Sequence, residues 1–341
     1  MVVEYDHKSF HIEAVGVEDF NFNELNDYED RTVFHSHEWF SFLKESQGAM
    51  PAILKIKHGD SVAGFFFGAI KKKFGFGIMG SPFKGWTTLY MGFTLHSQYR
   101  RRDVLPSILE FVFGELNCHH IEITDRYFSP GDGANLGMEC DVGRSFLIDL
   151  RKTKEELYDA MEKKSCRWCI RKARKEGVVI EEANDPGFAD DYCLQLKDVF
   201  SKQALVPTYS LPRVEQLIKH LGSTGNLLLL RARSPRGDCI ATGIFLASND
   251  MMIFWGGASL RKYQSFRPNE LVIWHAMNHW KDKGIKFFDM GGGGEYKRKY
   301  GGAEIPVISL RKSKNVLISE ARRFAKRAFR IKQRVQGYMK K

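Results

Sequence analysis

The sequence has no long hydrophobic run and no cysteine framework, and both absences restrict the class of protein. Apolar runs such as FFFGAI are far shorter than the ~20 residues of a transmembrane helix. The six cysteines show no framework spacing, and MVVEYDHKSF does not have the pattern of a signal peptide. We therefore expect a cytoplasmic protein with reduced thiols, in which any membrane contact is peripheral.

Metal-binding patterns are incomplete as well. His35 and His37 have no third ligand near them in the sequence, and Cys166 and Cys169 form a CxxC without a second pair. Solvated or capping histidines and spectator thiols explain these residues better than a metal does. The sequence therefore predicts no metal site.

The composition indicates a soluble protein with a substantial core. With 341 residues, the chain exceeds the ~250–300 residues at which a single core stops growing. It is 43% hydrophobic and 27% charged, with 26 Phe and 6 Trp available for the interior. We predict lobes at residues 1–150 and 151–312, followed by a C-terminal helix at 313–341.

Positive charge is concentrated at the C-terminus. The formal charge is +11, and residues 321–341 contain nine Lys or Arg and no acid. A stripe of apolar residues spaced three or four apart predicts a basic amphipathic helix over 316–341; its members are Leu317, Ala321, Phe324, Ala328, Ile331, Val335 and Tyr338. Such a helix either docks on an anionic membrane or packs on the protein body. Binding to tRNA is less favoured because interleaved aromatics are sparse.

Strand and helix patterns alternate along the first half. A strand is expected at 10–15, a helix beginning at Ser36, a hairpin over 51–70, a helix over 103–117 and a strand at 120–124. This mixture predicts an α+β or α/β arrangement.

The second half repeats the mixture with a clearer order. Helices are expected at 154–162, at a basic stretch ending at Gly177, and at 187–202 and 211–221. Three strands at 226–232, 239–247 and 251–257 predict an antiparallel meander. A helix over 269–283 and a strand over 285–290 then form a right-handed crossover.

The stretch IKFFDMGGGGEYKRKYGG, residues 285–302, is the strongest candidate for a functional site. Asp289 lies in a short buried strand, and the four glycines after it predict backbone at positive φ or close to a ligand. Two tyrosines and two lysines follow, a set suited to an anionic or carbonyl-bearing substrate.

The element order of the second half resembles the GNAT N-acyltransferase fold. The runs WCIRKARKEGV, GGASLRKYQSFRPNELVIWHAM, GIKFFDMGG and YKRKYGG resemble its FemAB-like branch, and HSHEW in the first half is similar to an early signature of that family. The resemblance implies an α+β protein with two GNAT-like lobes, each a mixed, mainly antiparallel sheet flanked by helices, with the basic amphipathic helix added at the C-terminus.

The resemblance also implies an acyl donor, acetyl-CoA or another acyl-CoA, lying between two splayed strands. The donor-binding residues implied are Trp255, Gly257, Ala258, Ser259, Arg261, Arg267, Asn269, Gly291 and Gly292. A glycine-spaced pyrophosphate loop is absent between Gly257 and Asn269, so acyl-CoA is inferred from the fold. No long coiled-coil insertion for tRNA is present, which favours a thioester donor.

Catalytic roles follow from the same resemblance. Lys297 is expected to stabilise the oxyanion, and Asp289 either orients the acceptor or binds its own glycine loop. Tyr296 positions the substrate or relays a proton. Residues expected to bind substrate are Trp39, Trp86, Arg167, Arg171 and Tyr300, with core packing as the alternative for the tryptophans and a solvated helix face for the arginines.

These observations predict an N-acyltransferase acting on an amino sugar or related amine, free or lipid-linked, for cell-surface polysaccharide or envelope synthesis. One alternative is an aminoacyl-tRNA-dependent transferase of the peptidoglycan-bridge type. Another is a catalytically inactive GNAT pair that serves as a binding scaffold.

Overall fold

A computed structural model describes residues 9–73, 75–202, 207, 210–292, 294–320, 322 and 324. The chain forms two compact units. Of the described residues, those up to Arg144 and those from Pro306 to Phe324 form the N-terminal unit, and Ser145–Ile305 form the C-terminal unit.

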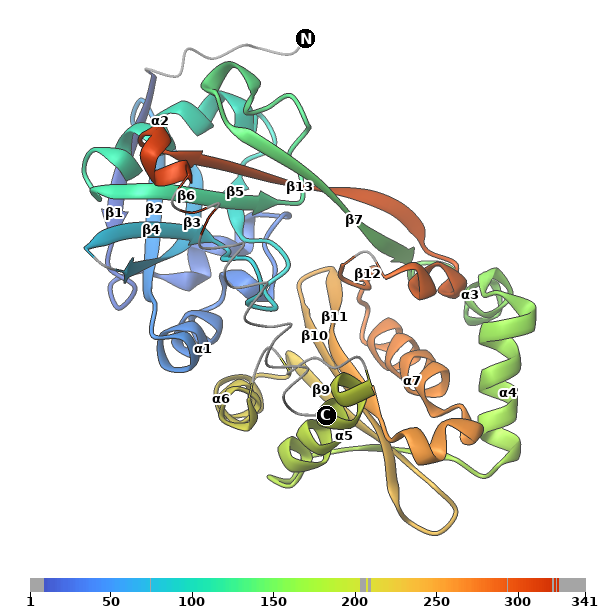
Figure 1. The fold of residues 1–341 in the computed structure, drawn as a ribbon. Coiled ribbons are helices and arrows are strands. Elements are labelled where there is room, and N and C mark those ends of the chain that lie inside the picture. The colour runs from blue at the N-terminus through green and yellow to red at the C-terminus, as the bar shows by residue number, and fades with distance from the viewer. Residues whose placement is uncertain are drawn as a thin grey trace. The chain divides into compact units, whose positions relative to one another are not determined.

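The N-terminal unit is built on a twisted sheet with one parallel pair of strands (Figure 1). The strands lie in the order β1 (Phe10–Val15), β2 (Met50–His58), β3 (Ser61–Lys73), β4 (Phe76–Ser81), β6 (Cys118–Asp125) and β13 (Ala303–Ser313). The short β5 (Gly92–Leu95) pairs with β3, and β4 runs parallel to β6. The hairpin expected over 51–70 is present as β2 and β3.

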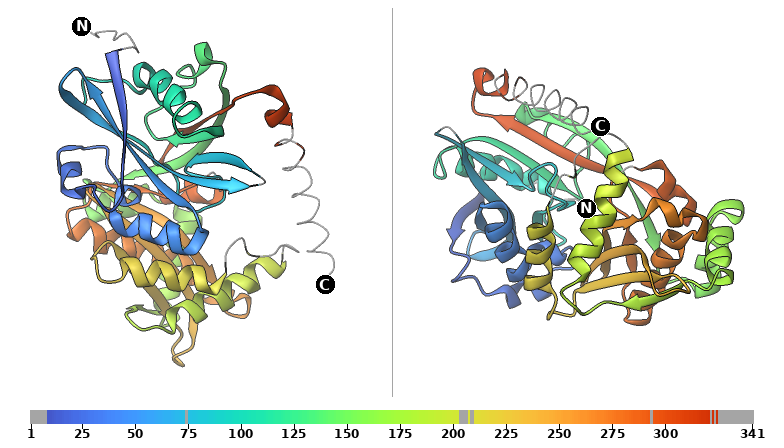
Figure 2. Two further views of the ribbon diagram at one scale, coloured as in Figure 1. Left: turned by 90° about the vertical axis from the view of Figure 1, so that its left-hand side faces the viewer. Right: turned by 60° about the horizontal axis from the view of Figure 1, so that its bottom comes forward.

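Alternation along β3 places helices on the two faces of this sheet. Phe66 belongs to a core cluster with α2 (Arg101–Phe113), whereas the neighbouring Phe65 and Phe67 face Phe20 and the α1 residue Phe40. Helix α1 (His37–Gln47) is capped by Ser36, as expected from the sequence. Figure 2 shows α1 (blue) and α2 (teal) on opposite sides of the sheet.

In the C-terminal unit the strand order begins with the last residues of β7 (Glu139–Asp149). The order continues with β12 (Phe287–Asp289), β11 (Met251–Ser259), β10 (Cys239–Ser248), β9 (Leu227–Arg233) and β8 (Val179–Glu182). Strands β9, β10 and β11 form the expected antiparallel meander. Strand β12 is parallel to β11, which confirms the crossover through the helix between them.

The helices of the C-terminal unit pack on its strands and on one another. The crossover helix α7 (Pro268–Asp282) shares a core cluster with α3 (Lys154–Ala160) and α4 (Trp168–Lys175). Helix α5 (Phe188–Lys202) packs on β10 and β11, and α6 (Leu211–Leu221) packs on α5. The combination of mixed, mainly antiparallel sheets with flanking helices confirms the predicted α+β class.

The division into units differs from the expected boundaries in two places. The first boundary falls at 144/145, inside β7, and the described residues from Pro306 to Phe324 belong to the N-terminal unit. The reason is β13, which the sequence analysis did not anticipate: its second half pairs with β6 and buries Ile308 and Leu310 in the N-terminal core.

The expected C-terminal helix lies mostly outside the described residues. Val316–Glu320 are helical, as are Arg322 and Phe324, and the stripe positions Leu317 and Phe324 are exposed. No helix in the described part of the chain combines the length and apolar character needed to span a bilayer.

Candidate functional site

The two central strands of the C-terminal unit separate at one end. Strand β12 pairs with β11 over three residues only, ending with Asp289 opposite Ile253. Strand β11 continues to Ser259, so its edge from Phe254 onward is not paired with β12. The expected separation of the two parallel strands is therefore present, and the glycine segment begins just after the end of β12.

Asp289 holds the start of the glycine segment. Its side chain is fully buried, and its Oδ1 accepts hydrogen bonds from the Gly291 N–H, at 2.8 Å, and from the Ser145 hydroxyl. Gly291 and Gly292 have φ values of +64° and +57°, which a side chain would disfavour. Of the two roles expected for Asp289, the contacts found are those that bind its own glycine loop.

Lys297 lies beside the same segment and is almost fully buried. Its Nζ donates to the backbone carbonyls of Met290, at 2.6 Å, and of Gly291. The Phe254 ring lies below the ammonium, with its centroid 5.6 Å away. Burial lowers the pKa of Lys297 to about 8, while the negative charge of Asp289 acts in the opposite direction. A cation is thus held next to the point where the pairing of β11 and β12 ends.

Tyr296 lies on the neighbouring surface cavity. This cavity has a volume of about 540 Å³ and lies between the 3-10 helix Glu295–Tyr300 and the segment that follows α3. Its wall includes Tyr296, Glu162, Ser165 and Lys299. Tyr296 is 56% exposed, and desolvation raises the pKa of its phenol. The phenol is therefore protonated at neutral pH and accessible to a ligand.

The N-terminus of α7 presents the expected cations. Arg261 and Arg267 are exposed, and Arg267 occupies the N-cap position with φ of +56° and no side-chain capping bond. The Ser259 hydroxyl accepts from the Asn269 amide at 3.1 Å, which joins the end of β11 to the first turn of α7. Of the β11 residues assigned to donor binding, Gly257 is exposed, whereas Trp255 and Ala258 are buried.

The two arginines expected on one helix face have different surroundings. Arg167 ends the π-helix Lys163–Arg167 and pairs with Asp159 at 2.6 Å, with its guanidinium near the Tyr158 ring. Arg171 is exposed on α4. Arg171 is consequently the residue of this pair that is free to bind an anion.

Two residues expected to bind substrate are too deeply buried to do so. Trp39 is 0% exposed and packs on Phe34 and Phe42, so it is a core residue and has no face for a sugar ring. Tyr300 is 2% exposed within the core of the C-terminal unit, and burial raises its pKa well above the ordinary value. Trp86 is half-buried, with its ring against Phe83 and the Lys71 ammonium.

Sequence reasoning missed several partners of the site. Ser145 carries no local signal, because it is far from Asp289 in the chain. Glu270 pairs with Lys299 at 2.5 Å, so the charge of Lys299 is balanced within the protein. The signal in the sequence was Glu270 itself, an acid in the first turn of the largely apolar helix α7. Trp168, 43% exposed beneath the Arg267 guanidinium at 5.7 Å, was also overlooked.

The CxxC thiols are poorly suited to chemistry. Cys166 and Cys169 are both buried and free, and desolvation raises the pKa of Cys166 to about 12. Among the residues that the structure describes, no group of three or more His, Cys, Asp or Glu side chains is placed to hold a metal ion.

Comparison with known families gives a direct match to this part of the chain. Residues 161–299 match the model described as "Acetyltransferase (GNAT) domain". The matched segment contains α4, the meander, α7, β12 and Lys297. A comparison with curated protein sequences found no match.

Solved structures with the same fold align with nearly the whole chain. FemX is 13% identical, with a TM-score of 0.72 over 91% of this chain and 99% of its own. A tandem GNAT protein from the clavulanic acid biosynthesis pathway is 10% identical, with a TM-score of 0.57 over 90% and 99% of the two chains. L-PGS from Bacillus licheniformis is 11% identical, with a TM-score of 0.54 over 88% and 93%.

The family match and the shared fold confirm the resemblance inferred from the sequence. Residues 161–299 therefore form a GNAT acetyltransferase domain, which indicates an acyltransferase, and the chain shares its fold with FemX and with a tandem GNAT protein.

Proposed function

We propose that the protein transfers an acyl group from acetyl-CoA, or another acyl-CoA, to the amine of an amino sugar or a related precursor of cell-surface polysaccharide or envelope material. The observation that carries the proposal is the unpaired edge of β11 facing the glycine segment that Asp289 and Lys297 hold. GNAT domains use such an edge to bind their donor, and the matched segment contains it.

The residues along this edge fit an acyl-CoA donor. Gly257 leaves the β11 edge without a side chain, so backbone groups are accessible to pantetheine amides. A pyrophosphate would be held by Arg267 and Arg261 together with the N-terminal N–H groups of α7. When bound, the donor supplies the thioester whose acyl group is transferred.

The proposed chemistry is direct attack of the acceptor amine on the thioester carbonyl. A C–N bond forms, negative charge develops on the carbonyl oxygen, and the C–S bond then breaks while the amine loses a proton. The Lys297 ammonium stabilises the developing charge. The Tyr296 phenol, protonated at neutral pH, supplies a proton to the leaving thiolate, and the proton that the amine loses restores the phenol.

Acceptor binding is proposed at the cavity beside Tyr296 and on the cationic face of α4. Arg171 is exposed there, and its guanidinium suits a phosphate of a nucleotide-linked or lipid-linked sugar. Glu162 and Ser165, which are hydrogen-bonded to each other at 2.6 Å on the cavity wall, offer polar contacts to a sugar.

The test is a thioester assay with the purified protein. Acetyl-CoA is incubated with a panel of amino sugars, free and nucleotide-linked, and the released thiol is measured together with the acylated product by mass spectrometry. Turnover that requires both the amine and Lys297 supports the proposal. Absence of thiol release with acyl-CoAs of several chain lengths contradicts the donor assignment.

A second candidate function, aminoacyl transfer from charged tRNA, is favoured by one observation. Exposed basic residues on α4 include Arg171, Arg174 and Lys175, which offer contacts to a nucleic-acid backbone. Activity with aminoacyl-tRNA and none with acyl-CoA would identify this function. Ligand binding without turnover of either donor would identify the scaffold alternative.

The proposed location is the cytoplasm, with peripheral attachment to the inner face of the membrane through residues 316–341. Leu317 and Phe324 are 81% and 75% exposed, so at these two positions the predicted stripe is not buried against the protein. Flotation with phosphatidylglycerol vesicles, compared with phosphatidylcholine vesicles and with a tRNA filter assay, tests this attachment.

A further inference from the structure

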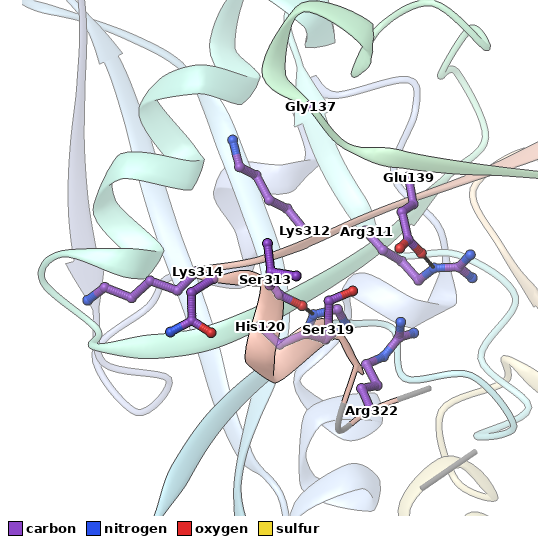
Figure 3. Close-up of a pocket in the computed structure, with 11 residues that line it drawn as sticks. His120, Gly137, Glu139, Arg311, Lys312, Ser313, Lys314, Ser319 and Arg322 are labelled. Atoms are coloured by element: carbon purple, nitrogen blue, oxygen red, sulfur yellow. Dashed lines mark hydrogen bonds and ion pairs between the residues drawn. The ribbon is translucent and has the colours of Figure 1, made fainter. Parts of the chain in front are cut away.

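A second cavity lies in the N-terminal unit, outside the segment that matches the GNAT model. It has a volume of about 280 Å³ and is formed by β6, the end of β13 and the residues that follow β13. Figure 3 shows the side chains of Ser313, Ser319 and Arg322 around His120, with Arg311 paired to Glu139. This volume is several times the ~30 Å³ share of a water molecule.

Two buried nitrogen atoms of residues that line the cavity lack a hydrogen-bond partner within the described part of the chain. His120 is 3% exposed; its Nδ1 lies 2.8 Å from the Ser313 hydroxyl, and its Nε2 has no partner. Arg311 Nε is also without a hydrogen bond, because the nearest carboxylate, that of Glu139, is 3.6 Å away. Buried polar groups are rarely left unsatisfied, so both atoms point to a ligand.

The cavity wall is cationic. Its charged side chains are the cations Arg311, Lys312, Lys314 and Arg322 and the carboxylate Glu139. Two further carboxylates pair with the arginines: Asp141 at 2.7 Å from Arg311, and Glu122 at 3.1 Å from Arg322. Four cations minus three carboxylates leaves one net positive charge, so the wall favours an anion.

The state of His120 agrees with an anionic ligand. Burial, together with the positive charges of Arg322 and Arg311, lowers its pKa to about 4, so the ring is neutral at neutral pH. A neutral ring has one N–H. When the Ser313 hydroxyl donates to Nδ1, that N–H is on Nε2 and is available to a ligand.

We propose that this cavity binds a phosphate group. The oxygens of a phosphate would accept hydrogen bonds from Arg311 Nε, His120 Nε2 and the Arg322 guanidinium, and Ser319 offers a hydroxyl on the same wall. A phosphate accepts hydrogen bonds from several directions at once, which matches donors that come from β6, from β13 and from the segment after β13. This site does not depend on the proposed acyl transfer.

Titration of the full-length protein with inorganic phosphate, followed by calorimetry and by 31P NMR line broadening, tests the proposal. Arg322→Gln and His120→Phe each remove one proposed donor, and each is expected to raise the Kd for phosphate about tenfold or more. Arg233→Gln is the matched control, because Arg233 also pairs with a carboxylate, that of Glu181 at 2.7 Å, but lies outside the cavity. The control is expected to bind phosphate as the unchanged protein does.

An experiment with phospholipid vesicles distinguishes a lipid headgroup from a soluble phosphate as the ligand. If phosphatidylglycerol vesicles bind and inorganic phosphate competes with them in an Arg322-dependent manner, the ligand is a lipid headgroup. If phosphate binds and does not compete with vesicles, the ligand is a soluble phosphate. Either result supports the site.

Two results would overturn the site. One is equal phosphate affinity in Arg322→Gln and the unchanged protein, a comparison that remains available even when His120→Phe fails to fold. The other is a crystal structure in phosphate buffer in which only water contacts His120 Nε2 and Arg311 Nε. Neither measurement requires turnover, so the outcome is independent of the proposed acyltransferase activity.

Discussion

Asp289 and Lys297 hold the same residue from two sides: the carboxylate of Asp289 accepts the N–H of Gly291, and the ammonium of Lys297 donates to its C=O. The two charges also attract each other, since Asp289 raises the pKa of Lys297 against the effect of burial. This arrangement fixes the backbone where β12 ends and β11 continues alone. The β11 edge proposed to bind the donor and the cation beside it are therefore parts of one local structure.

Replacing Lys297 by Met is expected to lower kcat/KM for acyl transfer by about 10²–10³-fold, because an oxyanion-stabilising charge contributes that much. Lysine-to-methionine substitution keeps a long apolar stem, so most of the packing on Phe254 remains. Lys281→Met is the matched control. Lys281 also donates to a backbone carbonyl, that of Leu150 at 2.8 Å, but it lies in the last turn of α7, away from the glycine segment. Similar losses in both variants would argue for a structural effect alone.

The pH dependence of the rate separates two roles for Lys297. Its pKa is about 8, so a role as the stabilising cation predicts that kcat/KM falls tenfold per pH unit above about pH 8. A role as general base predicts the opposite slope below that pH. Lys297→Arg retains the charge and is expected to remove the fall above pH 8. A rate that does not fall above pH 8 in the unchanged protein would rule out the cationic role.

The same pKa gives a stability prediction of definite sign. The pKa of Lys297 is about 8 in the folded protein and has the ordinary value of 10.5 in the unfolded chain. Between these two pH values the unfolded chain binds more protons at Lys297 than the folded protein does, so the free energy of unfolding rises with pH. The full gain is about 3 kcal/mol. Denaturant titrations at pH 7.5 and 10 measure it in the unchanged protein, and the gain is expected to disappear in Lys297→Met.

The sequence predicted the site better where its signal was local. Four glycines after an acid predicted backbone at positive φ or close to a ligand, and the resemblance to the GNAT fold implied where the strands part. Strand β13 was missed because its partner β6 lies far away in the chain, so its burial depends on a long-range pairing. Trp39 was assigned to substrate because composition alone does not distinguish a core tryptophan from one on a binding surface.

The bond between Asp289 and Ser145 is expected to matter for the order of the loop as well as for stability. Asp289→Ala removes a buried acceptor of two hydrogen bonds and leaves the Gly291 N–H and the Ser145 hydroxyl unsatisfied, a loss of about 2–4 kcal/mol in unfolding free energy. Ser145→Ala removes one donor only and is expected to lose about 1 kcal/mol. Hydrogen exchange at Gly291 should accelerate strongly in the first variant and little in the second; equal protection in both would contradict the assignment.

Arg267 is expected to contribute to donor affinity and not to the chemical step. It is exposed at the N-cap of α7 over the Trp168 ring, so Arg267→Gln should raise the KM for acetyl-CoA about tenfold while kcat changes less than about twofold. Arg236→Gln, in the turn between β9 and β10, is an exposed control expected to leave both constants unchanged. An equal effect with a pantetheine thioester that lacks the pyrophosphate would contradict the assigned contact.

In the N-terminal unit, Arg101 is expected to be the most important single ionic residue for stability. Its guanidinium donates to Asp125 at 2.8 Å and to Asp30 at 2.6 Å, and all three side chains are nearly buried. Arg101→Met leaves both carboxylates buried without a counter-charge, which costs about 3–5 kcal/mol. The measurement is the free energy of unfolding by denaturant. The control is Arg151→Met, which removes an exposed ion pair and is expected to change that free energy little.

The loss in Arg101→Met should also depend on pH in a predictable direction. Burial already raises the pKa of Asp30, and Arg101 acts against that rise, so removing the arginine raises the pKa further. A carboxyl whose folded pKa is raised is tolerated best below its unfolded pKa, because protonation then neutralises it, and its cost grows as pH rises. The difference in unfolding free energy between the variant and the unchanged protein is therefore expected to be smaller at pH 4.5 than at pH 7. A difference that is independent of pH would mean that Arg101 stabilises the unit by packing on the Tyr127 ring, 4.5 Å away, and not by charge.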